Sequence, residues 1–149
     1  MNKQKIIEDV TSLTKPIVES LGYEFVEANF DEVDGERYIT IVIYSEKGIT
    51  FDDCKIVSKA VDVPLDELNP TNDLSYSLNV SSLGLDRPIK TKRDFERYLN
   101  KQIEIYDQGK KQVATVLAVD EFEVKLKVKN VIKTIKLSDN LKAMPYVKF

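Results

Sequence analysis

The sequence contains no histidine and a single cysteine, and both scarcities narrow the chemistry open to the protein. Without histidine the chain lacks the commonest metal ligand and the commonest general acid or base near neutral pH. A lone cysteine, Cys54, cannot form an internal disulfide, and its place in an apolar register predicts a buried, unreactive thiol. The composition therefore argues against metal-dependent and histidine-dependent catalysis.

Glycine is also scarce, with five residues in 149. The chain has no Walker-type phosphate loop, no dinucleotide-binding glycine motif, no nucleophile elbow and no paired metal ligands. The many carboxylates of the first half fall in expected turns, caps and helix surfaces, where a solvated role is the default. We therefore expect no enzymatic activity, no metal site, no cofactor and no small-molecule substrate. A small enzyme that uses carboxylates is the least favoured hypothesis.

Long apolar runs are missing as well. No stretch approaches the roughly 20 apolar residues that a membrane span requires, and residues 1–11 are too charged for a secretory signal. We therefore expect a cytoplasmic protein with no membrane contact. With 42% hydrophobic and 32% charged residues, the chain can bury a core and form one or two small domains.

Charge is distributed very unevenly along the chain. Residues 1–86 carry 7 Lys and Arg against 17 Asp and Glu, a net of −10, whereas residues 87–149 carry 15 against 8, a net of +7. Such an asymmetry suggests that one half meets a polyanion and that the other avoids it or meets a basic protein. It also favours two domains, an acidic one over 1–86 and a basic one over 87–149.

Periodicity predicts an α-β-β-α-β order in the acidic half. Apolar residues recur at helical spacing over 3–20, with Gly22 just beyond. Two β-patterned runs, 23–31 and 37–44, flank Asp34-Gly35 and predict a hairpin. Thr50 and Asp53 form a capping box for a second helix, which we expect to end near residue 62, before Pro64. Residues 76–81 alternate as a strand. Two helices on one face of a three-stranded sheet is the simplest arrangement.

The basic half begins with a second capping box, Thr91 with Asp94, which opens a linker helix over about 91–100. Arg93, Arg97 and Lys101 are spaced four apart, so a helix of this length would align them as a phosphate-facing stripe. Phe95 and Leu99 would face the core. We expect nearby cations to supplement the stripe: Arg87, Lys90 and Lys92.

Five short β-patterned runs follow between residues 102 and 147, which suggests a small barrel. Residues 121–129 alternate strictly, so that Val124, Leu126 and Val128 point inward. Lys125, Lys127 and Lys129 then point outward. Solvation alone accounts for each lysine taken singly, but three on one strand also suit an anionic partner.

A longer motif separates the two halves. Residues 81–88, Ser-Ser-Leu-Gly-Leu-Asp-Arg-Pro, follow a strand and precede the basic helix, and they resemble the signature of the bacterial ribosome maturation factor RimP. Leu83 stands where that family usually has proline. The resemblance extends to Gly48-Ile-Thr-Phe-Asp-Asp-Cys54 and to Leu141-Lys-Ala143. It implies an SH3-like or Sm-like C-terminal barrel and a non-enzymatic factor that binds the free small (30S) ribosomal subunit late in its assembly.

The motif itself allows two roles, a domain hinge and a direct partner contact. We expect a monomer whose partners are ribosomal RNA and ribosomal proteins. A protein-only adaptor, whose barrel binds a peptide and whose lysines only confer solubility, is the alternative. The candidate ribosome- or RNA-binding residues are Gly84, Leu85, Asp86, Arg87, Lys90, Lys92, Arg93, Arg97, Lys101, Lys125, Lys127 and Lys129.

Overall fold

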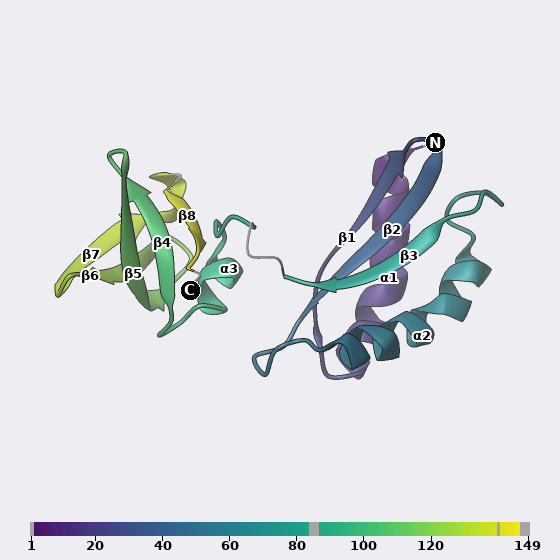
Figure 1. Cartoon of the computed structure of the whole chain (residues 1–149), viewed down its shortest axis with the longest axis horizontal. Coiled ribbons are helices and arrows are strands. Elements are labelled where there is room, and N and C mark those ends of the chain that lie inside the picture. The colour runs from purple at the N-terminus through teal and green to yellow at the C-terminus, as the bar shows by residue number, and fades with distance from the viewer. Residues whose placement is uncertain (1, 84–86, 140, 147–149) are drawn as a thin grey trace. The chain divides into compact units, whose positions relative to one another are not determined.

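The computed structural model describes residues 2–83, 87–139 and 141–146, and the chain divides into two compact units, residues 1–83 and residues 84–149 (Figure 1). The first unit is mixed α/β and the second holds an antiparallel five-stranded sheet. The predicted α+β class is therefore confirmed at this level. No helix in the described ranges is long and apolar enough to cross a membrane.

The first helix, α1 (Lys3–Ser20), lies where the apolar spacing predicts it. Asn2 caps its start, because the Asn2 side chain accepts a hydrogen bond from the Lys5 amide at 3.1 Å. The helix ends just before Gly22, whose φ of +91° favours glycine. Its buried side chains recur along one face: Ile6, Val10, Thr14 and Val18.

The predicted hairpin is formed by β1 (Glu24–Val33) and β2 (Glu36–Tyr44). Its turn residues Asp34 and Gly35 both have positive φ, at +52° and +80°, which is the geometry that suits the right-handed twist of the strands. β3 (Ser77–Ser82) then pairs with β2 in parallel, giving the sheet order β1-β2-β3. The acidic unit therefore has the α-β-β-α-β order expected from the sequence.

The core of the first unit lies between this sheet and its two helices. Ile39, Ile41 and Ile43 of β2 are fully buried on one face of the sheet. Because successive strand residues alternate between faces, these three side chains define the face that the helices cover. The buried residues of both helices join the same cluster, so α1 and α2 cover one side of the sheet.

The second helix corrects one sequence prediction. α2 runs unbroken over Phe51–Leu68, so the expected end near residue 62 is wrong. Pro64 lies inside it and removes one helical N–H donor. The helix continues because Val61 and Leu65, on either side of Pro64, are both fully buried and extend the apolar face. Asn69, at φ +52°, ends the helix in a left-handed cap.

The second unit contains the five predicted strands in the order β7-β6-β5-β4-β8, after a short helix α3 (Lys92–Glu96). Two-residue turns with positive φ connect β4 to β5, through Gln108 and Gly109, and β6 to β7, through Lys129 and Asn130. The strand bounds are β4 (Gln102–Asp107), β5 (Lys110–Val119), β6 (Glu123–Val128), β7 (Val131–Lys136) and β8 (Lys142–Pro145), with a 3₁₀ turn over Leu137–Asp139.

The sheet of the second unit curves around its own core. Ile103, Ile105 and Leu126 are fully buried, and a bulge between Val116 and Ala118 bends β5. In the part of the chain that is described, no hydrogen-bonded pairing joins β7 to β8. The sheet is therefore open between these two strands, and closure into an SH3-like barrel stays a prediction.

Candidate nucleic-acid interface

The outward lysines of β6 have the alternation that the sequence predicts. Val124, Leu126 and Val128 are buried, whereas Lys125 and Lys127 are exposed. Their neighbours across the sheet are uncharged: Ala118 and Thr134 flank Lys125, and Thr115 and Ile132 flank Lys127. Neither ammonium group therefore faces a carboxylate directly across a strand pair. Lys129 is exposed too, but it lies in the β6–β7 turn with a φ of +48°.

A further lysine on this surface was missed by sequence reasoning. Lys136 of β7 is exposed and pairs with Glu123 of β6, which places it on the same outer face as Lys125 and Lys127. The segment Val131-Ile-Lys-Thr-Ile-Lys136 does not alternate cleanly between apolar and polar residues. Register with β6, which only the fold provides, assigns Lys136 to the outer face.

Helix α3 corrects the predicted basic stripe. Its capping box is present: the Thr91 side chain accepts from the Asp94 amide at 3.1 Å, and Asp94 accepts from the Thr91 amide at 3.0 Å. The helix nevertheless ends at Glu96, so Arg93, Arg97 and Lys101 do not share one helical face. The predicted helix over about 91–100 is therefore too long.

The early end of α3 has a local cause. Asn100 has a φ of +63°, and its amide donates to the Val116 carbonyl of β5 at 2.7 Å. The Val116 amide donates in turn to the Lys101 carbonyl at 3.1 Å. These bonds direct the chain along β5, so that Lys101 leads into β4 as an exposed residue.

Arg97 differs most from its predicted role. Its side chain is only 6% exposed, and its guanidinium donates to Asp94 Oδ1 at 2.9 Å. Arg93, by contrast, is exposed and lies 3.9 Å from Glu96. Arg97 therefore forms an ion pair with Asp94 at the end of α3, and its side chain is mostly covered rather than presented to solvent.

Asp94 is the acceptor around which this segment is built. Burial would raise the pKa of the Asp94 carboxyl, but hydrogen bonds from the Thr91 and Lys90 amides, with the charge of Arg97, hold the pKa below its usual value. The residue is therefore ionised at neutral pH. It fixes the Lys90 backbone while the Lys90 side chain stays exposed.

Asp120 lies in the turn between β5 and β6. The pKa of its carboxyl is lowered, chiefly because the amides of Phe122 and Glu123 donate to it, each at 2.8 Å. The charges of Lys92 and Lys125 act on it in the same direction. One lysine at the start of α3 and one on the outer face of β6 therefore act on the same carboxylate.

The remaining candidate residues lie around the motif. Arg87 is half-buried and engaged in contacts, and Lys90 follows it as an exposed cation. Gly84, Leu85 and Asp86 lie outside the described residues. We define the basic surface by these exposed lysines of α3, the segment between α3 and β4, β6, the β6–β7 turn and β7: Lys92, Lys101, Lys125, Lys127, Lys129 and Lys136.

The acidic unit presents the opposite charge. A shallow hollow of about 300 Å³ is lined in part by Asp62, Asp66, Asp73 and Tyr76. Burial raises the pKa of Tyr76 to about 12, and the charge of Asp66, to which its hydroxyl donates at 3.4 Å, adds to the effect. In the described ranges no group of three or more Cys, Asp or Glu residues could hold a metal ion.

Comparison with known families identifies the first unit. The profile of the RimP N-terminal domain matches residues 13–86, from the middle of α1 to Asp86 of the motif. The chain belongs to the RimP family of ribosome maturation factors. The match includes the hairpin, α2 and β3, so it covers most of the acidic unit. The basic surface lies beyond the matched residues.

Proposed function

We propose that this chain is a maturation factor that binds the free small (30S) ribosomal subunit and assists its late assembly by binding alone. The RimP match over residues 13–86 carries the proposal. The exposed lysines of the second unit support it, because ribosomal RNA is the dominant polyanion of the subunit.

The two units divide the work in this proposal. The second unit, with its basic surface, contacts RNA phosphates, whereas the first, with a net of −10 over residues 1–86, is repelled by RNA and contacts a basic ribosomal protein. Crosslinks placed at Asp31 or Asp66 should therefore reach ribosomal protein. Crosslinks mainly to ribosomal RNA would contradict this division.

Three finer features belong to the same proposal. The second unit is an SH3-like barrel whose opening lies between β7 and β8. The protein acts as a monomer in the cytoplasm, and it needs no cofactor. Its effect on assembly follows from differential affinity: a factor that binds immature subunits more tightly than finished ones stabilises one conformation of the RNA and then leaves.

The test is a charge reversal on the outer face of β6. Lys125→Glu with Lys127→Glu should weaken binding to immature small subunits, because two exposed cations without a carboxylate opposite are replaced by anions. The slope of log affinity against log salt should also decrease by roughly one unit per lost phosphate contact. Co-sedimentation at several salt concentrations measures both quantities.

A matched control is available on α2 of the acidic unit. Lys55→Glu with Lys59→Glu changes the net charge equally at two exposed positions, and the salt slope should stay that of the parent. Circular dichroism and melting confirm the fold of both variants. If both variants lost affinity for immature subunits equally, the loss would reflect net charge alone, and the assignment of the basic surface as the RNA contact would be wrong.

A further inference from the structure

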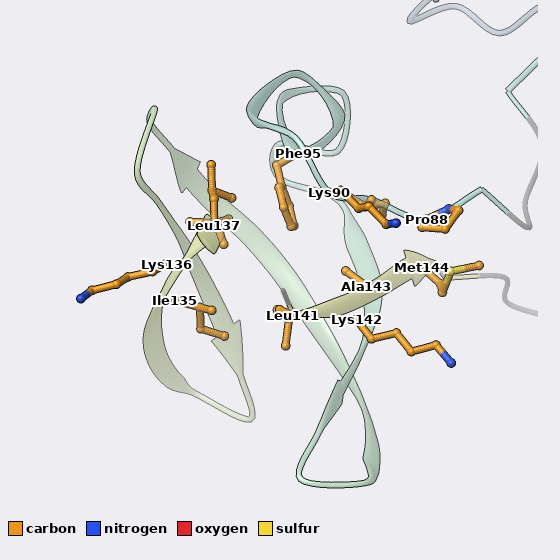
Figure 2. Close-up of a pocket in the computed structure, with 12 residues that line it drawn as sticks. Pro88, Lys90, Phe95, Ile135, Lys136, Leu137, Leu141, Lys142, Ala143 and Met144 are labelled. Atoms are coloured by element: carbon orange, nitrogen blue, oxygen red, sulfur yellow. The ribbon is translucent and has the colours of Figure 1, made fainter. Parts of the chain in front are cut away.

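The second unit contains an apolar pocket that the proposed RNA contact does not use. It has a volume of about 390 Å³ and opens between β7, β8 and the segment before α3 (Figure 2). Buried residues, Ile89, Phe95 and Val124, form part of its lining. Figure 2 shows Phe95, Ile135 and Leu141 directed toward a common space. The pocket is large enough for one bulky apolar side chain.

The charged side chains that line this pocket are all basic, whereas Asp107 and Asp139 line an adjoining hollow that shares Ile135, Leu141 and Lys142 with it. The described lining residues include three lysines, Lys90, Lys136 and Lys142, and no Asp or Glu. The side chains of Lys136 and Lys142 extend away from the pocket on opposite sides (Figure 2). The Lys142 ammonium lies 4.8 Å from the centre of the Tyr106 ring, so the two charges are held to either side of the apolar space, where they suit carboxylates on either side of an inserted side chain.

A strand edge borders the same pocket. β7 pairs with β6 along one edge, and no pairing to its other edge occurs among the described residues. The free edge of β8 is already occupied in part, because the Ile89 amide donates a hydrogen bond to the Ala143 carbonyl at 2.9 Å. β7 is thus the edge that can accept an added strand, through backbone groups that recognise any extended peptide.

From these three features we propose that the opening between β7 and β8 binds an extended acidic segment of a partner protein. The segment adds a strand to β7 near Ile135 and Lys136 and inserts one aliphatic or aromatic side chain into the pocket. The ion pair between Lys133 and Asp107, at 3.3 Å, connects β7 to β4 and marks one end of the site. The neighbouring acidic residues of the segment meet the lysines.

An RNA base suits this pocket less well than a peptide does. Bases bind sequence-tolerantly by stacking on exposed aromatic rings, but Phe95 is only 2% exposed. The other lining side chains, lysines apart, offer no hydrogen-bond donors or acceptors that could recognise base edges. An extended peptide, by contrast, matches both the apolar pocket and the β7 edge.

A second copy of the chain is also a poorer occupant. Phe122 is 76% exposed and flanked by Asp120, Glu121 and Glu123, so its chemistry resembles that of the proposed segment. However, Asp120 accepts hydrogen bonds from the Phe122 and Glu123 amides, which fixes Phe122 in a tight turn. That turn cannot lie along β7 as an added strand.

The experiment uses the full chain and a fluorescein-labelled eight-residue peptide with four glutamates, three valines and one central leucine. No ribosome or RNA is present, so the result is independent of the small-subunit proposal. Fluorescence anisotropy should show saturable binding. Serine in place of the leucine should weaken it roughly ten- to a hundred-fold, because burial of one leucine is lost. Lysines in place of the glutamates should abolish binding.

Protein variants locate the site. Lys142→Glu should weaken binding about three-fold, as expected for reversal of one exposed charge, whereas Lys110→Glu at the exposed start of β5 should not. Leu141→Ala should weaken it further if its melting curve stays cooperative; if it unfolds, the peptide series decides. On binding, amides of β7 should gain protection from hydrogen exchange, which a purely electrostatic contact would not produce.

Three outcomes would overturn the proposal. The first is equal affinity for the leucine and serine peptides. The second is binding of single-stranded oligouridine in place of the acidic peptide: the peptide does not bind, the oligouridine does, and Leu141→Ala weakens the oligouridine binding. In the third, the chain self-associates in sedimentation, and Phe122→Ser removes the association.

Discussion

The helices α2 and α3 begin in the same way and end very differently. Each opens with a threonine whose side chain accepts from the backbone amide of an aspartate three residues on, and the carboxylate of each aspartate accepts from the threonine amide. Yet α2 continues for 18 residues across a proline, whereas α3 stops after five. The cap fixes where a helix starts and says little about its length.

Burial explains the difference. α2 places Val57, Val61 and Leu65 in the core at a spacing of four, so each further turn adds buried apolar area. α3 buries only Phe95, and the chain gains more from hydrogen bonds to β5 than from another helical turn. The length of α3 is therefore set by its neighbours, and the part-buried ion pair between Arg97 and Asp94 should matter for its stability.

The largest effect is expected at Arg97. Arg97→Glu would place a second carboxylate beside Asp94 in a site where the arginine is almost covered, and should lower the free energy of unfolding by about 3 kcal/mol. The exposed neighbour Arg93 provides the control, since Arg93→Glu should change it by about 0.5 kcal/mol or less. Thermal unfolding of the full chain measures both. Similar losses for the two would show that Arg97 is not specially placed.

A smaller loss is expected at the α3 cap. Asp94→Ala removes the acceptor of the Lys90 and Thr91 amides and leaves Arg97 without this partner, which should cost about 2 kcal/mol. The corresponding change in α2, Asp53→Ala, removes a cap that also accepts from the Tyr23 hydroxyl but has no buried cation beside it, and it should cost less. Urea unfolding of the two variants ranks them. A larger loss for Asp53→Ala than for Asp94→Ala would show that the ion pair with Arg97 does not make the α3 cap the more important of the two.

Pro64 gives an effect of opposite sign. Pro64→Ala restores a donor to the Ala60 carbonyl within α2, which favours the helix, whereas the greater freedom of the unfolded chain opposes this gain. The net rise in the free energy of unfolding should be about 1 kcal/mol. A higher Tm with an unchanged circular dichroism spectrum is the expected result. A lower Tm would mean that the packing of the partly buried proline ring outweighs the missing hydrogen bond.

The pH dependence of Asp94 gives the subtlest difference. Its folded pKa lies below the usual 3.8, so the unfolded chain takes up the proton first as pH falls. The stability that Asp94 contributes is complete above that value and is lost on acidification through the folded pKa. Between about pH 5 and pH 2.5, the free energy of unfolding should therefore fall less steeply in Asp94→Asn than in the parent. Identical pH profiles would contradict the lowered pKa.

Most of the fold could be predicted from the sequence because its signals are local. Regular apolar spacing predicts α1, alternation predicts β6, and Asp34-Gly35 predicts the hairpin turn, and the structure contains all three. Two errors concern helix ends, at Pro64 and beyond Glu96, and a third follows from the second: Leu99, expected to face the core, is 39% exposed because α3 ends before it. Both helix ends depend on contacts with residues distant in sequence, namely the core around Leu65 and the hydrogen bonds to Val116, which no local pattern contains.

The candidate site was predictable only in part, for the same reason. The outward direction of Lys125 and Lys127 follows from alternation within one strand. The buried state of Arg97 depends on where α3 stops, and the place of Lys136 depends on cross-strand register. Spacing alone could not separate an arginine that binds a partner from one that holds the fold.

The parallel pairing of β2 with β3 has a consequence for how the first unit forms during synthesis. The hairpin of β1 and β2 can form as soon as both strands are made. The pairs of β2 with β3, from Tyr38 with Ser77 to Ile43 with Ser82, can form only after the whole of α2 has been made. Contacts that span so much chain form slowly. A nascent chain that ends before residue 77 therefore has an unpaired β2 edge beside Ile39 and Ile41, and premature termination there should yield an aggregation-prone fragment.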